Sequence, residues 1–340
     1  MAQLQALEKI QHEKLVAQFG EAKGEEYFQD YMYARRVIFD EIAPEIIAIE
    51  PALTDHGPKH LDNVLLNAHK LLGDTVANLT GIELYVLCVG ILFHDVGNIE
   101  GRIGHNSKIS KVHEYVRKGA PAIFRREKDI VMRVAEAHCG HTPEGSNDTL
   151  KPMPPTMELH GESVRVPEIA ALIRLADELA EGPQRTSFFM HCAGRYPREN
   201  VIHHKYALSI SEIAINRNSK RIALTLDINL TTTDTGNISF DEEVSLDTFL
   251  EYSFRRIMKL DEERRFTKHY SDWLSPFKST SVSFCFWLDG ERLDLDLDAL
   301  IMSDLSVPGS DTRSLSDFDP KYTVDNIVAT LGGFAPRGEA

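Results

Sequence analysis

Apolar positions recur with a helical period over roughly the first 195 residues of the chain. From Pro58 to Leu72 they return every three or four positions, and His60 lies on a face that also carries core-type residues. The run Leu84–Leu92 is apolar nearly all round, which is typical of a buried helix, and it is too short to span a bilayer. Similar patterns predict helices to about residue 49 and over residues 105–117, 128–137 and 167–180.

The period changes after about residue 200. Alternating patterns predict strands over residues 206–215, 221–230 and 281–288 and near 293–297, with a long helix over 246–270. We therefore expect an α+β chain that is mainly an all-α helical bundle, with a smaller C-terminal α+β unit. The predicted domains are an N-terminal helical segment (1–50), a helical domain (51–195), a small α+β domain (200–300) and an acidic, loosely held tail (301–340). Residues 143–164 are predicted to be a loop, either a lid or only a connection.

Composition and charge narrow the possible partners. The 340 residues are 42% hydrophobic and 26% charged, as in a globular, soluble protein. A formal net charge of −15 argues against extended contact with nucleic acid. A small phosphorylated substrate stays compatible, because metal ions can supply positive charge locally. Four scattered cysteines and the absence of a signal-peptide pattern or a membrane-span pattern predict a cytoplasmic protein without a disulfide framework.

The polar residues of the helical region point to metal binding. His94 and Asp95 follow a long apolar run, where a charged or polar group is costly unless it is paired. Taken alone, this pair could also be a hydrogen-bonded histidine and a surface aspartate at a helix end. Other histidines and aspartates at helix ends, however, make a shared metal site the better interpretation. Together with those two, the candidate ligands are His60, His105, His138 and Asp177, with His56 and His141 beside them. Four histidines and two aspartates suit a pair of divalent or iron-type ions.

The order of these residues resembles the HD-domain superfamily of metal-dependent phosphohydrolases. His60 with Val64 is similar to the opening His-x-x-x-Val motif of that family, and His94–Gly97 is similar to its His-Asp-x-Gly signature. Ile173–Asp177 is similar to its closing Arg-Leu-Ala-Asp helix. The resemblance covers roughly residues 50–190 and implies an HD-type all-α bundle around the metals.

The resemblance also implies a ligand set, and the chain departs from the family pattern at two positions. One metal would be held by His60, His94, Asp95 and Asp177, and Asp95 would bridge to a second metal held by His105 and His138. Many members of the family bind one metal and lack the two middle histidines. Cys139 stands where the two-metal branch has an adjacent histidine, so His141 could replace that ligand or contact the substrate phosphate. Asn98 stands where many relatives have lysine.

The function implied by the resemblance is hydrolysis of a phosphoester of a nucleotide or cyclic nucleotide by a metal-bound hydroxide. The expected cofactor is a pair of divalent ions, drawn from Mn, Fe, Ni, Co, Mg and Zn. Asp95 would be catalytic, and His56 or His141 would protonate the leaving oxygen. Cations near the ligands are candidates for binding the substrate phosphate, namely Lys59, Arg102, Lys108 and Arg185. Arg174 could be either a structural partner or a phosphate contact.

Two other functions remain open on the same residues. Some relatives of this fold use such ligands to hold two irons and activate dioxygen, so a di-iron oxygenase is the first alternative. The second is a non-catalytic nucleotide-sensing module. The resemblance also leads us to expect a homodimer. Five further histidines are predicted to be ordinary surface residues, namely His69, His113, His191, His203 and His204.

Overall fold

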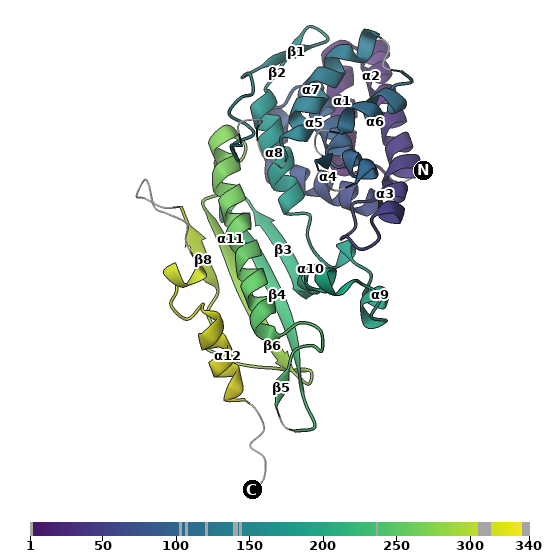
Figure 1. The fold of residues 1–340 in the computed structure, drawn as a ribbon. Helices are drawn as coiled ribbons and strands as arrows, with labels where there is room; N and C mark the ends of the chain where they lie inside the picture. The colour runs from purple at the N-terminus through teal and green to yellow at the C-terminus, as the bar shows by residue number, and fades with distance from the viewer. Residues whose placement is uncertain are drawn as a thin grey trace. The chain divides into compact units, whose positions relative to one another are not determined.

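The computed structural model describes residues 3–101, 104–105, 108–119, 122–138, 142, 145–235, 237–304 and 314–334. The chain divides into two compact units. Unit 1 consists of Met1–Ala180 with Phe266–Pro276, and unit 2 consists of Glu181–Arg265 with Phe277–Ala340. A mainly helical part and a sheet-containing part are both present (Figure 1), so the predicted α+β fold class is confirmed.

Helices dominate unit 1, and the predicted helix from Pro58 to Leu72 is confirmed at both ends. The helices of this unit are α1 (Ala6–Phe19), α2 (Glu21–Val37), α3 (Ala43–Ile49), α4 (Pro58–Leu72), α5 (Gly81–Phe93), α6 (Ile109–Val116), α7 (Arg125–Glu136) and α8 (Val166–Glu178), with a π-helical turn η1 (Ile38–Ile42) and the 3₁₀ turns η2 (Gly73–Asn78), η3 (Val96–Glu100) and η5 (Ala122–Phe124). Helix α5 is the centre of the unit, because all its residues are buried and it packs against α1, α2, α4, α7 and α8. Thr80 begins α5 with a capping box, in which its hydroxyl accepts from the Glu83 N–H and the Glu83 carboxylate accepts from the Thr80 N–H.

The apolar stretch that includes α5 was the only candidate for a membrane span among the described residues. The segment Gly81–Glu100 is long and apolar enough by composition, but 94% of its most apolar window is buried inside the protein. This burial is what the core helix of a soluble protein shows. The predicted cytoplasmic location stays a prediction.

Two predictions about unit 1 are wrong. The predicted loop over residues 143–164 ends in an antiparallel hairpin, formed by β1 (Met157–Leu159) and β2 (Glu162–Val164). Its turn has positive φ at Gly161, which glycine adopts without strain. His113 is not a surface residue, because its side chain is fully buried and lies 3.0 Å from the Glu127 carboxylate.

Unit 2 is built around a mixed sheet and one long helix. Its elements are η6 (Pro183–Arg185), α9 (Phe188–Cys192), α10 (Arg198–Ser209), β3 (Ile210–Asn216), β4 (Arg221–Thr232), β5 (Ile238–Ser239), α11 (Leu246–Tyr270), β6 (Ser279–Leu288), β7 (Glu291–Arg292), β8 (Leu300–Ser303), η7 (Leu315–Asp317) and α12 (Val324–Gly332). Strands β4 and β6 are parallel neighbours, and α11 is the crossover between them. Strand β3 pairs with β4, and β7 and β8 pair with β6, all antiparallel. The last residues of α11 are counted with unit 1.

The structure corrects four predictions in unit 2. The strand predicted from residue 206 begins at Ile210, because residues 206–209 are the last turn of α10. No strand covers residues 293–297, all of which are described; the pairing segment is β8, a few residues further on. His204 is buried and stacks on Tyr196 at 3.5 Å between ring centroids. The segment predicted to be an acidic tail contains most of β8 and all of α12, whose Ile327 is fully buried.

Candidate metal centre

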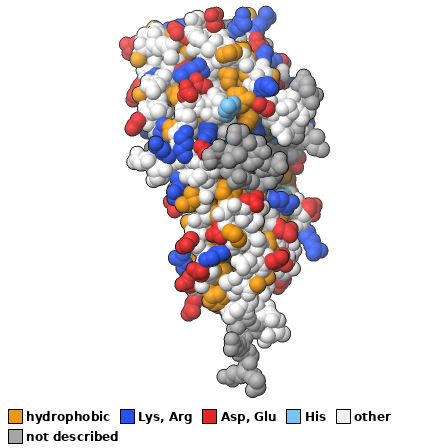
Figure 2. Space-filling view, turned by 90° about the vertical axis from the view of Figure 1, so that its left-hand side faces the viewer, with side chains coloured by type: hydrophobic (Ala, Val, Ile, Leu, Met, Phe, Trp, Pro, Cys, Tyr) orange, Lys and Arg blue, Asp and Glu red, His pale blue; other side chains and the backbone are white. Residues whose placement is uncertain are grey.

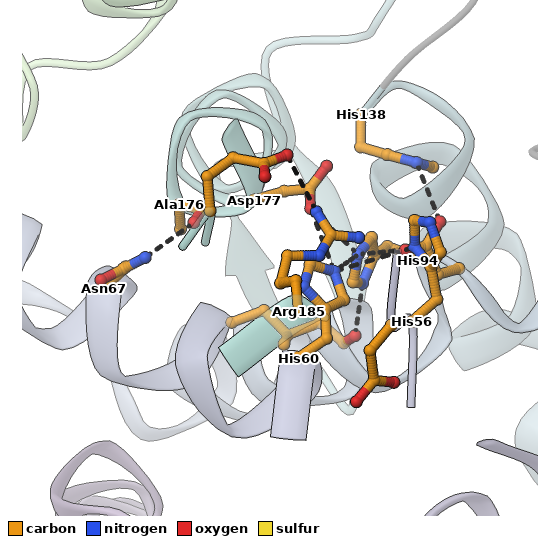
Figure 3. Close-up of polar contacts among 12 residues, drawn as sticks. His56, His60, Asn67, His94, His138, Ala176, Asp177 and Arg185 are labelled. Carbon is orange, nitrogen blue, oxygen red and sulfur yellow. Dashed lines mark hydrogen bonds and ion pairs between the residues drawn. The ribbon is translucent and has the colours of Figure 1, made fainter. Parts of the chain in front are cut away.

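The first two predicted ligands lie on neighbouring helices of unit 1. His60 is in the first turn of α4, and Asp177 is in the last turn of α8. The side-chain amide of Asn67 on α4 donates to the carbonyl oxygen of Ala176 on α8 at 3.2 Å (Figure 3). This hydrogen bond joins the two helices beside Asp177 and helps to hold His60 and Asp177 on facing surfaces.

The other ligands lie where helices end or begin. His94 and Asp95 follow the last residue of α5, and His138 lies two residues beyond the end of α7. His105 lies in the short segment before α6. Because α5 packs against both α7 and α8, the ends of these helices bring residues far apart in the sequence to one place.

A first group of four ligand atoms converges around His60. Its Nε2 lies 3.1 Å from Asp177 Oδ1, 3.3 Å from His94 Nε2 and 3.3 Å from Asp95 Oδ2. His94 Nε2 lies 3.2 Å from the same Asp95 oxygen and 3.6 Å from Asp177 Oδ1. Figure 3 shows the side chains of His60, His94 and Asp177 pointing toward one another. Their ligand atoms all lie within 4.8 Å of one another, so this group could hold one metal ion.

A second group shares Asp95 through its other oxygen. Asp95 Oδ1 lies 3.3 Å from His105 Nε2 and 3.6 Å from His138 Nε2. The two histidine nitrogens are 3.4 Å apart. The structure therefore brings together all six predicted ligands, in two groups that meet at one carboxylate, and the second group could hold a second ion.

The orientation of two histidine rings fits metal binding. His94 Nδ1 lies 2.7 Å from the Ile91 carbonyl oxygen, and His138 Nδ1 lies 2.5 Å from the Ala135 carbonyl oxygen. A carbonyl oxygen only accepts, so each Nδ1 carries the hydrogen and each Nε2 is left to face the other ligands. Backbone contacts of this kind fix the ring of a metal-ligating histidine. The donor set of histidine nitrogens and carboxylate oxygens suits a divalent transition metal.

In the metal-free cluster, the buried histidines and aspartates shift one another's pKa. Burial alone would raise the pKa of Asp95, but the charges of His94 and His56 and hydrogen bonds from His105 and His138 hold it well below its usual range. Burial likewise opposes ionisation of Asp177, yet hydrogen bonds from His60 and His94 lower its pKa well below that range. Burial disfavours the charged form of His94, but the neighbouring carboxylates raise its pKa to about 9. The cluster therefore keeps a proton that a metal ion would displace.

Gly97 is required by the path of the backbone beside the second group. A Cβ atom at this position would lie 1.8 Å from the carbonyl oxygen of His105. Any side chain there would force His105 to move. The glycine that follows the His-Asp pair thus permits the close approach that places the imidazole of His105 beside Asp95.

Two further side chains contact the shared carboxylate. His56 Nδ1 lies 2.7 Å from Asp95 Oδ2, so the predicted catalytic residue His56 does lie at the centre. The side-chain amide of Asn98 donates to Asp95 Oδ1 at 3.0 Å. Sequence reasoning singled out Asn98 only as a departure from the family and missed this contact. The signal was its spacing, since a residue three positions after Asp95 in a helical turn can reach back to it.

Three of the four predicted substrate-binding residues lie in the described part of the chain. Lys59 is exposed on α4, next to His60 in the chain. Lys108 Nζ donates to the carbonyl oxygen of Glu100 at 2.9 Å. Arg185 belongs to unit 2, where its buried guanidinium lies 3.2 Å from the carboxylate of Glu181.

Three residues of interest cannot be placed, because Arg102, Cys139 and His141 lie outside the described residues. Arg174 is described, and it has structural partners within unit 1. Its Nη1 donates to Thr149 Oγ1 at 2.9 Å, and its guanidinium lies 4.7 Å from the centroid of the Phe266 ring.

A sequence model of the family described as HD-CE matches residues 50–257. The match covers more than half of the 340 residues and includes every ligand of the two groups. No curated protein and no solved structure matches the chain. The family match thus covers the whole candidate metal centre.

Proposed function

The chain belongs to the HD-CE family, and we propose that it is a metal-dependent phosphohydrolase of the HD-domain superfamily. Its proposed substrate is a phosphoester of a nucleotide or a cyclic nucleotide. The position of Asp95 is the observation that carries the proposal, because each of its carboxylate oxygens faces a separate group of histidines. A carboxylate so placed suits a pair of divalent ions, which is a recurring arrangement in phosphoryl-transfer sites.

The proposed division of labour follows the two groups. When bound, the pair of ions supplies the positive charge that activates water and stabilises charge on the phosphoryl oxygens. The residues that would hold the first ion are His60, His94, Asp95 and Asp177, and those that would hold the second are Asp95, His105 and His138. The metal is taken from Mn, Fe, Ni, Co, Mg and Zn, and the donor set alone does not choose among them.

His56 is the best-placed candidate for proton transfer. With its Nδ1–H donated to Asp95 Oδ2, its Nε2 is the ring atom that takes up or releases a proton. The carboxylate also stabilises the imidazolium form of His56, as an acid that protonates a leaving oxygen requires. His141 remains the second candidate for this role.

Charge supports a small substrate rather than an extended nucleic acid. The net charge is −15, and acidic and basic side chains are interspersed over the described part of the face in Figure 2. The phosphate of a small substrate would be neutralised chiefly by the metal ions. The cations proposed to assist are Lys59, Arg102, Lys108 and Arg185.

The test combines metal analysis with a product assay on full-length protein. We expect about two metal equivalents in the wild-type protein, and loss of both in Asp95→Ala, because this variant removes the ligand common to the two groups. We also expect phosphoester hydrolysis from a panel of nucleotides and cyclic nucleotides in the presence of Mn, Ni or Co. A protein that binds no metal after supplementation with Mn, Fe, Ni and Zn would contradict the proposal.

Assays of oxygen uptake and nucleotide binding, added to these, separate the alternatives. Bound iron with catalytic oxygen uptake and no hydrolysis would favour a di-iron oxygenase. Nucleotide binding without turnover in any metal would favour a sensing module. The expected homodimer is a separate proposal, and light scattering of the full chain in solution tests it.

A further inference from the structure

Asn98 is a buried polar residue whose side chain is directed at the backbone and carboxylate of one metal ligand. It lies in the 3₁₀ turn η3 and has no exposed surface. Its amide nitrogen lies 3.0 Å from both the carbonyl oxygen and the Oδ1 atom of Asp95. The Asn98 backbone N–H also donates to the Asp95 carbonyl, at 3.0 Å. The side-chain amide and the backbone N–H of Asn98 therefore both donate hydrogen bonds to Asp95.

These hydrogen bonds matter because the two carboxylate oxygens of Asp95 have different neighbours. Oδ1 faces His105 and His138, and Oδ2 faces His60 and His94. Rotation of the carboxylate plane about χ2 would remove both oxygens from these positions, and χ2 of an aspartate is a soft torsion. Asn98 holds one oxygen of this carboxylate.

We propose that Asn98 is a positioning residue that holds Asp95 Oδ1 toward His105 and His138 and thereby sets the metal affinity of the second group. The inference rests on the proposed function only in that both ligand groups bind metal. The second group has three protein ligands and the first has four. A misdirected Asp95 therefore costs the second group a larger share of its donors than the first. Loss of an orienting hydrogen bond of this kind typically weakens metal binding by about 10- to 100-fold.

The experiment compares full-length wild type with Asn98→Leu, which keeps a similar volume but has no hydrogen-bond donor. Metal-free protein is titrated with Mn²⁺, and bound metal and the electron paramagnetic resonance spectrum are recorded. Wild type is expected to bind two ions and to show the signal of a coupled pair. In Asn98→Leu the first ion should bind with wild-type affinity, the second about 10- to 100-fold more weakly, and the coupled signal should be lost.

Asn67→Leu is the matched control, because it removes another buried amide donor in the same unit, the one on the Ala176 carbonyl. Asn67 lies beside His60 and Asp177 of the first group, so any loss of affinity in this variant should fall on the first ion, and the second ion should bind as in wild type. Asn98→Ala, which lacks the amide and adds no bulk, serves in place of Asn98→Leu if that variant does not fold.

Unchanged binding of the second ion in the Asn98 variants would overturn the inference. An equal loss of affinity for the second ion in Asn67→Leu would also overturn it. Wild type that binds no second Mn²⁺ would overturn the inference and the two-metal centre together. Wild type that binds two ions but hydrolyses no phosphoester would overturn the proposed function alone, because the readout for Asn98 is metal binding and not turnover.

Discussion

His94 illustrates how a buried charge is stabilised at the candidate metal centre. It lies at the end of α5 with no exposed surface, and its Nε2 faces two carboxylates. Burial of an imidazolium is unfavourable by itself, but the neighbouring Asp95 and Asp177 more than offset that cost. The same carboxylate charges that would attract a metal ion therefore hold a proton on His94 in the metal-free protein.

The raised pKa of His94 predicts how the stability of the metal-free protein depends on pH. A pKa of about 9 in the folded state, against an ordinary value of 6.5, means that the folded protein binds this proton more tightly than the unfolded chain does. The resulting stabilisation is complete below pH 6.5 and is lost as pH rises through about 9. Urea unfolding in the presence of a chelator, compared between wild type and His94→Gln, should show the difference in unfolding free energy shrinking over that range. A constant difference between the two proteins would contradict the assignment.

At the scale of elements, a buried ion pair joins the helices that lead to the second ligand group. The Glu127 carboxylate on α7 accepts from Arg117 Nε at 2.8 Å and from its Nη2 at 2.9 Å. The same carboxylate contacts His113 on α6 and the hydroxyl of Tyr85 on α5. Burial opposes ionisation of Glu127, but Arg117, His113 and Tyr85 together lower its pKa. This cluster connects α5, α6 and α7 through charges that have no access to water.

Removal of Glu127 should therefore destabilise unit 1 severely. Glu127→Ala leaves the buried guanidinium of Arg117 without its partner carboxylate, which costs about 3 to 5 kcal/mol. The neighbouring pair between Lys128 and Glu114 is much more exposed, at 24% and 51%, so Lys128→Ala should cost no more than about 1 kcal/mol. Chemical unfolding of the metal-free variants measures both values. Equal effects of the two substitutions would show that burial of the pair does not matter.

At the scale of the whole molecule, the two units are not consecutive stretches of chain. Residues 266–276 follow most of α11 in sequence but belong to unit 1. Within unit 1 the ring of Trp273 is buried, and the guanidinium of Arg165 lies 4.6 Å from its centroid. Tyr270 in the same segment donates its hydroxyl to Asp148 at 2.6 Å. A late segment of the chain therefore helps to build the unit that contains the candidate metal ligands.

The two tryptophans of the chain allow the units to be followed separately. Trp273 belongs to unit 1 and Trp287 to unit 2, so the variants Trp287→Phe and Trp273→Phe each keep one reporter. Mn²⁺ should raise the urea midpoint reported by Trp273, with a stabilisation of about 2.7 kcal/mol at a hundredfold excess over Kd. The midpoint reported by Trp287 should move less, because the proposed ligands all lie in unit 1. A larger shift at Trp287 would contradict the placement of the metal site.

Local patterns were sufficient for much of the fold and for picking out the candidate ligands. Pro58, which suits a first helical turn, and the spacing of apolar residues predicted α4, and the continuous apolar run predicted the buried position of α5. These signals lie in neighbouring residues of the sequence. The His-Asp pair after an apolar run marked the centre, since an unpaired polar group is costly there. The long helix from Leu246 to Tyr270 also followed from its pattern.

Tertiary packing settled what no local pattern contains. His113 reads as a surface residue in its own helix, and only the packing of α6 on α7 buries it against Glu127. The separate neighbours of the two Asp95 oxygens, and the position of residues 266–276 in unit 1, likewise depend on segments far apart in the sequence. Residue types and periodicity are properties of short stretches, whereas the distances between ligand atoms depend on how the helices pack against one another.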